Sequence, residues 1–282
     1  MTERGSGFGV RGARRPDGRR VPSGPGGLGW GSDVPPTADR LPPAALLLHH
    51  AAGSASDWSE IVGLLSGRME VLAPDMPGHG MWVLGEPLRS IEALASHVAG
   101  MLRDRRRAPV VAVGHSMGGA IAMHLALDYP ELVGGLVLIS TGARLRVAQA
   151  LMDVVREHFP QLPQQMMAMG FASTADPAVV ARWMAAPWAA SPAAALADFA
   201  ACDRYDVRVR LGEVKVPAVV MVGEQDMMTP EKRSQELISG IPGARLRVVP
   251  GAGHMLPWER PREVAEEILA LAGLAGDERG GP

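Results

Sequence analysis

Residues 109–119 read Pro-Val-Val-Ala-Val-Gly-His-Ser-Met-Gly-Gly, an apolar run that passes directly into a glycine-rich turn. The run before Gly114 has the length and β-branched content of a buried strand, and a helical pattern starts at Met117. A serine flanked by glycines at such a junction is held in a strained turn, with its hydroxyl projecting from the strand end. The stretch therefore predicts that Ser116 is a nucleophile. A phosphate-binding glycine loop is disfavoured, because the spacing G-x-G-x-x-G is missing here.

Short apolar runs like this one recur along the chain and alternate with helical patterns. They predict buried parallel strands at 44–49, 69–73, 110–114, 135–140, 218–223 and 245–249. Apolar residues at helical spacing predict helices over 91–102 and 117–132, and Pro261 marks the start of another. Strands that alternate with helices form a parallel sheet covered on both faces. The predicted fold class is α/β, with a mostly parallel sheet and helices on both faces.

The alternation stops between residues 142 and 211, where the sequence predicts helices and no strand. Asp176-Pro177 and Ser191-Pro192 each place a capping residue before a proline, as at the start of a helix. We expect a helical cap here, inserted after the strand that follows the Ser116 helix and covering the strand ends where ligands of open α/β sheets bind. The predicted organisation is a flexible Gly, Pro and Arg-rich leader at 1–43, a core at 44–141 and 212–275, a cap at 142–211 and a tail at 276–282.

The composition of the 282 residues excludes several classes of protein. Hydrophobic residues make up 47% of the chain, which is ample for a core. The net charge of −2 and the lack of a basic stripe argue against a nucleic-acid partner, and no apolar run is long enough for a membrane span. The single cysteine, Cys202, excludes an internal disulfide and a multi-cysteine zinc site. The arginine pairs at 14–15 and 19–20 are not followed by the apolar segment of an export signal, so we expect a cytoplasmic protein.

A serine hydroxyl is a poor nucleophile without a base, so a histidine should lie near Ser116. His254 occupies a glycine-rich loop directly after the last predicted strand, where its ring can reach the serine turn. His97 and His124 fall within predicted helices, where structural or solvent-facing roles are expected. We therefore predict that His254 is the catalytic base.

The base needs an acid that fixes its tautomer and stabilises its charged form. Asp226 follows the predicted strand at 218–223, and Glu224 is its nearest rival. The chain order serine, aspartate, histidine is the one expected for this type of sheet. We therefore predict a triad of Ser116, Asp226 and His254.

The chain resembles the α/β-hydrolase superfamily over about residues 44 to 273. The resemblance rests on the serine turn at 114–119, Gly223-Glu224-Gln225-Asp226, Gly251-Ala252-Gly253-His254, Asp75-Met76-Pro77-Gly78-His79-Gly80 and the loop at 51–58. These motifs are typical of the superfamily as a whole and not of one activity within it.

The resemblance also implies an oxyanion hole made of two backbone amides, those of Ala51 and Met117. The superfamily usually has His-Gly where this chain has His49-His50. We expect the added β-carbon of His50 to strain the loop or narrow the site. The resemblance implies a structural role for His79.

These parts predict acyl transfer to water by a serine hydrolase that uses no metal and no organic cofactor. The predicted cap is rich in Met and Trp, so we expect a small, largely apolar carboxylic ester as substrate. The resemblance leaves open a thioesterase, a carbon–carbon bond hydrolase, a lactonase, a cofactor-free perhydrolase, or a ligand receptor with little turnover. The sequence indicates no oligomeric state. The candidate pocket residues are His50, His115, Trp183, Met184, Trp188 and Met255.

Overall fold

The computed structural model describes residues 44–106, 108–186 and 190–274, and these contain a six-stranded sheet. The strands are β1 (Ala44–Leu48), β2 (Glu70–Leu72), β3 (Val110–His115), β4 (Val133–Ile139), β5 (Ala218–Gly223) and β6 (Arg245–Val249). Their order is β2-β1-β3-β4-β5-β6, and every neighbouring pair is parallel. The six predicted strands are confirmed, each close to its predicted bounds. The predicted leader, the predicted tail and Trp188 lie outside the described residues.

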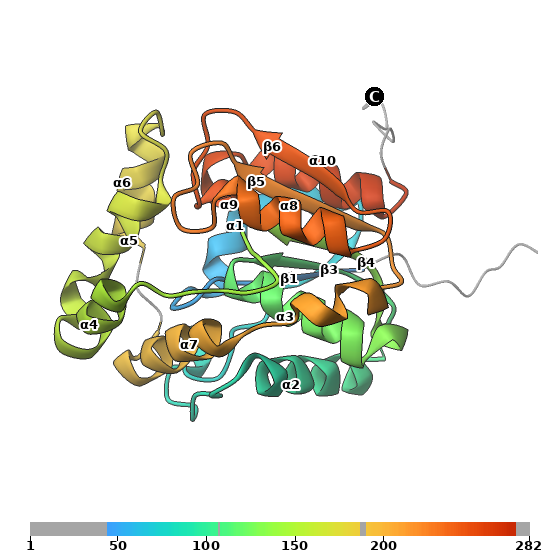
Figure 1. The fold of residues 1–282 in the computed structure, drawn as a ribbon, viewed down its shortest axis with the longest axis horizontal. Helices are drawn as coiled ribbons and strands as arrows, with labels where there is room; N and C mark the ends of the chain where they lie inside the picture. The colour runs from blue at the N-terminus through green and yellow to red at the C-terminus, as the bar shows by residue number, and fades with distance from the viewer. Residues whose placement is uncertain (1–43, 107, 187–189, 275–282) are drawn as a thin grey trace, which may run out of the picture. The chain divides into compact units, whose positions relative to one another are not determined.

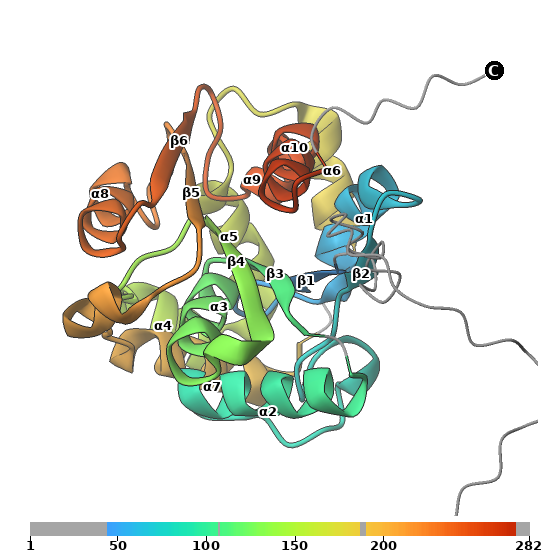
Figure 2. The same cartoon turned by 90° about the vertical axis from the view of Figure 1, so that its right-hand side faces the viewer.

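Helices cover both faces of this sheet, as Figure 2 shows. One face carries α1 (Ser59–Leu65) and α10 (Pro261–Leu271), and the other carries α2 (Ile91–Asp104), α3 (Met117–Asp128) and α8 (Glu231–Gly240). The side chains of β1 alternate between the two cores: Leu46 and Leu48 pack with α2 and α3, and Leu47 packs with α1 and α10. Burial on both faces explains why the four central strands, β1, β3, β4 and β5, are nearly uninterrupted apolar runs. The parallel sheet with helices on both faces confirms the predicted fold class.

Between β4 and β5 the chain forms a helical insertion instead of another strand (Figure 1). Its α-helices are α4 (Gln149–Glu157), α5 (Leu162–Gly170), α6 (Pro177–Ala185) and α7 (Pro192–Arg204). Asp176 and Ser191 cap α6 and α7 at the predicted places, each accepting a hydrogen bond from a backbone amide of the first turn. An antiparallel bridge between Arg144 and Asp206 joins the two ends of the insertion. The chain therefore enters the insertion and returns from it at neighbouring positions.

Shorter elements complete the described part of the chain. They are the 3-10 helices η1 (Ala55–Trp58), η2 (Gly80–Trp82), η3 (Pro130–Leu132), η4 (Phe159–Gln161) and η5 (Arg208–Glu213), and the short helix α9 (Leu256–Glu259). None of the helices described here combines the length and the apolar character that a bilayer crossing needs.

The carboxyl ends of four parallel strands bring four loops together. The loop after β1 begins at His49, the turn after β3 carries Ser116, the loop after β5 carries Asp226 and the loop after β6 carries His254. Because parallel strands end at the same edge of a sheet, residues far apart in the sequence meet there.

Candidate active site

Ser116 occupies a strained turn between β3 and α3, with φ 53° and ψ −112°. Two glycines make room for it: a β-carbon on Gly114 would collide with the backbone of Gly118, and one on Gly118 would collide with the carbonyl of Leu48. The carbonyl of Ser116 also accepts a hydrogen bond from the Thr141 hydroxyl at 2.8 Å. The turn persists because close packing on every side fixes a backbone conformation that L-residues rarely adopt.

His254 and Asp226 form a buried, hydrogen-bonded pair. His254 Nδ1 lies 3.0 Å from Asp226 Oδ2 and 3.1 Å from Oδ1. Asp226 also accepts hydrogen bonds from the amides of Met228 and Thr229 at 3.0 and 2.8 Å, and from the Thr229 hydroxyl at 2.8 Å. Burial alone would raise the pKa of Asp226, but the charge and hydrogen bond of His254 and the bonds from Thr229 lower it below its usual value. Asp226 is therefore ionised at neutral pH and can hold a proton on Nδ1.

The second ring nitrogen of His254, Nε2, is buried and has no hydrogen-bond partner among the described residues. With the proton held on Nδ1 by Asp226, Nε2 carries a lone pair and can accept a proton. Ser116 and His254 both line a cavity of about 150 Å³. This arrangement places a histidine nitrogen that can accept a proton and a serine hydroxyl at the same cavity, which nucleophilic catalysis would require.

The cavity lies between the sheet core and the helical insertion. The core contributes Ala51, Ser116, Met227, Met228, Thr229 and His254, and the insertion contributes residues 145–148, Leu151, Met169, Phe199 and Cys202. Most of these side chains are apolar, and the one cation, Arg146, has a side chain that is 56% exposed. No group of three His, Cys, Asp or Glu side chains that could hold a metal ion occurs within 44–106, 108–186 or 190–274.

The loop after β1 brings a backbone amide to this cavity. Ala51 lines the cavity, and within the described part of the chain the amides of Ala51 and Met117 donate no hydrogen bond. The next residue, Ala52, has a left-handed backbone with φ 61°, and its amide donates to Asp198 Oδ2 at 2.9 Å. Unpaired amides at the serine turn and the facing loop are what an oxyanion hole needs.

The ring of His49 holds this loop in place through two hydrogen bonds. Burial, together with the neighbouring His79, lowers the pKa of His49 to about 3, so its ring is neutral. Its Nδ1 donates to the carbonyl of His50 at 2.8 Å, and its Nε2 accepts a hydrogen bond from the amide of Met76 at 3.2 Å. The ring therefore joins the loop after β1 to the loop after β2.

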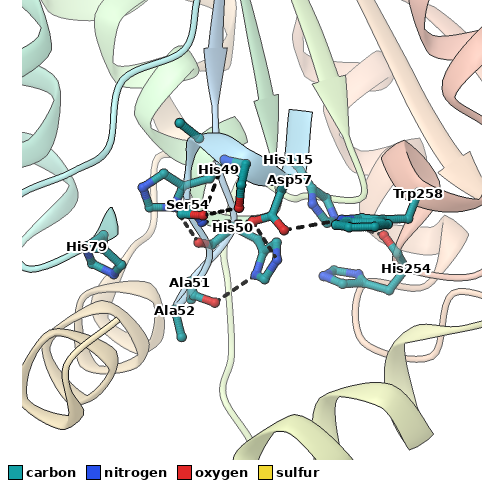
Figure 3. A network of polar contacts seen from close by, with 12 residues as sticks. His49, His50, Ala51, Ala52, Ser54, Asp57, His79, His115, His254 and Trp258 are labelled. Atoms are coloured by element: carbon teal, nitrogen blue, oxygen red, sulfur yellow. Dashed lines mark hydrogen bonds and ion pairs between the residues drawn. The ribbon is translucent and has the colours of Figure 1, made fainter. Parts of the chain in front are cut away.

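His50 and His115 are buried and are not among the residues that line the cavity. Figure 3 shows both rings near His254. The His50 ring lies edge-on to His115 at 5.2 Å, its Nδ1 donates to the Ala51 carbonyl at 2.8 Å, and its Nε2 is 3.4 Å from Asp57 Oδ2. His115 Nε2 donates to the His254 carbonyl at 2.8 Å. The strain expected at His50 is not found: the left-handed residue of this loop is Ala52, because that is where the chain turns back toward η1.

The other candidate pocket residues within the described part also lie away from the cavity lining. Trp183 is buried on α6 with its ring 5.4 Å from that of Phe171, and Met184 packs against the core from a partly buried position. Met255 is fully buried, and its amide donates to the carbonyl of Gly170 at 2.9 Å. Trp183 and Met255 therefore belong to the packed interior.

Thr229 and Asp198 belong to this region and were not predicted from the sequence. Thr229 touches both members of the acid–base pair, because its hydroxyl donates to Asp226 and lies 3.2 Å from His254 Nδ1. The spacing D-x-x-T, typical of a turn in which a carboxylate binds the following amides, was the available signal. Asp198 on α7 accepts hydrogen bonds from the Ala52 amide and from His79 Nε2, the latter at 2.8 Å. These partners are far away in the sequence, so no local sequence pattern predicts them.

A family model described as "Alpha/beta hydrolase family" matches residues 45–267. The chain belongs to this family. Among curated proteins, this α/β hydrolase is 27% identical over 261 residues to the 2-hydroxy-6-oxo-6-phenylhexa-2,4-dienoate hydrolase of Comamonas testosteroni, covering 81% of this chain and 86% of the relative. It is also 27% identical over 228 residues to the pimeloyl-[acyl-carrier protein] methyl ester esterase of Nitrosomonas europaea, covering 75% and 88%.

A solved structure of a thermophilic esterase from Thermogutta terrifontis has the same fold. It superposes with a TM-score of 0.74 at 26% identity and covers 82% of this chain and 89% of that one. The resemblance expected from the sequence motifs is therefore confirmed for this α/β hydrolase.

Proposed function

We propose that this α/β hydrolase is a serine hydrolase that cleaves small, largely apolar carboxylic esters through an acyl-enzyme. The observation that carries the proposal is the hydrogen bonding of His254. Its Nδ1 binds Asp226, its buried Nε2 has no hydrogen-bond partner among the described residues, and His254 lines the same cavity as Ser116. The similarity to two esterases, from Nitrosomonas europaea and Thermogutta terrifontis, supports an ester as the substrate.

In the first step the Ser116 hydroxyl oxygen attacks the ester carbonyl carbon and His254 Nε2 takes the hydroxyl proton. The imidazolium that forms is stabilised by the ionised Asp226, which Thr229 holds in place through two hydrogen bonds. His254 then returns the proton to the departing alcohol. Water attacks the acyl-enzyme in a second round that uses His254 again as base and then as acid.

The carbonyl oxygen becomes negatively charged in both tetrahedral intermediates. In the proposed mechanism the amides of Ala51 and Met117 bind this oxygen, and each such donor stabilises the transition state by about 3 to 4 kcal/mol. The Ala52 amide cannot share the role, because it is already bonded to Asp198.

The cavity supports the proposed substrate size. Its volume of about 150 Å³ is close to that of an apolar cavity that accommodates benzene, so it suits an acyl group of a few carbons. In this proposal residues 142–211 act as a cap over a core of 44–141 and 212–275, and the apolar side chains of the insertion contact the acyl chain. Flexible methionines such as Met169, Met227 and Met228 suit acyl groups of varied shape.

The proposal is tested with purified protein, a fluorophosphonate probe and nitrophenyl esters of increasing acyl length. We expect covalent labelling of the wild type, turnover that is highest for short and medium acyl chains, and neither labelling nor turnover in Ser116→Ala. The matched control is Ser239→Ala, since Ser239 is exposed on α8 and is not among the residues that line the cavity. Ester turnover by Ser116→Ala within tenfold of wild type would rule out Ser116 as the nucleophile.

Hydrolysis of a carbon–carbon bond is the second candidate. The hydrolase of Comamonas testosteroni is named for a dienoate that carries a ketone and no ester, and the match covers 81% of this chain. The two candidates are separated by comparing kcat/KM for 2-hydroxy-6-oxo-6-phenylhexa-2,4-dienoate, a nitrophenyl butyrate and the corresponding thioester. A clear preference for the dienoate would replace the ester proposal.

A further inference from the structure

The carboxylate of Glu259 joins two segments that lie far apart in the sequence. Glu259 ends α9 and is buried, with 9% of its surface exposed. Its Oε1 accepts a hydrogen bond from the Gly253 amide at 2.9 Å, and its Oε2 accepts one from the Ala172 amide at 3.1 Å. Gly253 precedes His254, and Ala172 follows α5 of the helical insertion. One side chain therefore holds the His254 loop and the insertion together.

The two segments are also in direct backbone contact around His254. A β-carbon on Gly253 would lie 2.6 Å from both the Ala172 amide nitrogen and the Gly170 carbonyl oxygen, so only glycine permits this approach. On the other side of His254, the Met255 amide donates to the same Gly170 carbonyl at 2.9 Å. A shift of the insertion at Gly170 would therefore move the backbone that carries His254.

The same segment of the insertion reaches the cavity and the loop of the acid. Met169, next to Gly170, lines the cavity. Ser173 donates from its amide and its hydroxyl to Gln225 Oε1 at 3.0 and 2.8 Å, and Gln225 precedes Asp226. Residues 169–173 thus connect the wall that faces the substrate with the loops of His254 and Asp226.

We propose that Glu259 is a positioning residue. By binding the amides of Gly253 and Ala172 at the same time, it fixes the position of His254 Nε2 relative to the part of the insertion that lines the cavity. The inference rests on the proposed function, because it assigns Glu259 to the geometry of that reaction. The two amides bind different oxygens of Glu259, and a carboxylate offers an acceptor at both positions, whereas a glutamine amide would present the donor NH2 group to one of the two N–H groups. Burial raises the pKa of Glu259, because a buried carboxylate costs free energy. The hydrogen bonds from the two backbone amides offset part of that cost.

The test compares Glu259→Gln with Glu224→Gln in the full chain. Glu224 is the matched control, because it accepts a hydrogen bond from Gly251 of the same loop at 3.0 Å but is exposed and binds none of the described residues of the insertion. We expect Glu259→Gln to lower kcat for nitrophenyl butyrate about tenfold or more at 25 °C, with KM changed less than about threefold, since a small misplacement of a catalytic group is costly. Glu224→Gln should keep kcat within about twofold.

A second readout follows the position of His254 without turnover. The proton between His254 Nδ1 and Asp226 should give a far-downfield proton resonance, which we expect to shift or broaden in Glu259→Gln but not in Glu224→Gln. Wild-type kcat and an unchanged resonance in Glu259→Gln would overturn the positioning role. A wild type that hydrolyses no ester would overturn the proposed function instead, and the resonance would still test Glu259.

Glu259→Asp keeps the carboxylate and both its oxygens but shortens the side chain by one methylene. This variant tests the proposal if Glu259→Gln does not fold. We expect it to lower kcat at least about threefold, because both contacts cannot then be kept at hydrogen-bond length. Wild-type kcat in Glu259→Asp, with an unshifted resonance, contradicts the proposal.

Discussion

At the scale of single residues, the histidines at the carboxyl end of the sheet differ in their hydrogen-bonding roles, because each ring has different neighbours. His49 is neutral and accepts a backbone hydrogen bond, since burial lowers its pKa to about 3. Burial and the neighbouring His254 and His50 hold the pKa of His115 well below its usual value, and its neutral ring donates to the His254 carbonyl. His49 thus supports the loop after β1 and His115 supports the backbone of His254, and neither ring carries charge.

The first residue-scale prediction concerns His50, whose ring is buried against His115 and Asp57 and does not line the cavity. We expect His50→Gly to lower the free energy of unfolding by about 2 to 4 kcal/mol, because it removes a packed ring and leaves a void. The kcat for esters should change less than about threefold. Denaturant unfolding and steady-state kinetics measure the two effects.

The matched control is His158→Gly, which removes an exposed ring at the end of α4 and should cost less than about 1 kcal/mol. A hundredfold fall in kcat with unchanged stability in His50→Gly would instead assign the His50 ring to the reacting groups.

At the scale of elements, the contact between α3 and β1 depends on a glycine. A β-carbon on Gly118 would collide with the Leu48 carbonyl at the end of β1 and lie 2.9 Å from the His49 carbonyl. Backbone atoms cannot yield as side chains do, so we expect Gly118→Ala to destabilise the fold by about 3 kcal/mol or more and to abolish ester hydrolysis. Gly100→Ala is the control: Gly100 lies in α2 with open space around its Cα, so alanine should stabilise the fold by about 0.5 to 1 kcal/mol. Equal melting temperatures for the two variants would contradict the packing argument.

The elements themselves could be predicted because their signals are local. A strand buried on both faces is a short apolar run, as Val110–His115 is, and a Ser-Pro or Asp-Pro pair begins a helix because both capping and a fixed φ act within one turn. The order of Ser116, Asp226 and His254 was readable for a related reason: each follows the end of a predicted strand. Parallel strands then bring those ends to one edge without further information.

The contacts between elements could not be predicted in this way. Asp198 binds the Ala52 amide across 146 residues, and Glu259 binds Ala172 across 87, so neither pair leaves a periodic trace in the sequence. The cavity lining was missed for the same reason: the orientation of the insertion on the core decides that Phe199 and not Trp183 lines the cavity together with Ser116. Composition shows which side chains are apolar but not which cavity they line.

At the scale of the described chain from β1 to α10, two buried carboxylates join the helical insertion to the sheet core. Asp198 on α7 binds the loop after β1 and His79, and Glu259 on α9 binds the His254 loop and the end of α5. The Asp198 contact is next to Ala51 of the proposed oxyanion hole, and the Glu259 contact is next to the proposed base, His254. The insertion is therefore bonded to the core at both places, and a displacement of the insertion at either place would have to break a buried hydrogen bond.

The His79–Asp198 contact makes stability depend on pH in a defined direction. Burial alone would lower the pKa of His79, but the hydrogen bond to Asp198 and its charge outweigh burial and raise the pKa above 6.5. A histidine whose pKa is raised on folding adds stability that is complete below the unfolded pKa and is lost as pH rises through the folded pKa. We expect the difference in unfolding free energy between wild type and His79→Gln to be largest below about pH 6 and to shrink above 6.5. Denaturant unfolding at a series of pH values measures it.

Replacing the partner should reverse this dependence. In Asp198→Asn the amide oxygen can still accept from Ala52, but the charge that raises the pKa of His79 is gone and burial then lowers that pKa. The proton must leave His79 for the chain to fold, so in this background the contribution of His79 should be smallest at acid pH and grow as pH rises toward neutral. Comparing Asp198→Asn with the double variant Asp198→Asn, His79→Gln isolates that contribution from every other titrating group. The same falling slope in both backgrounds would mean that Asp198 is not the cause, and the buried pair would then join insertion and core by its hydrogen bonds alone.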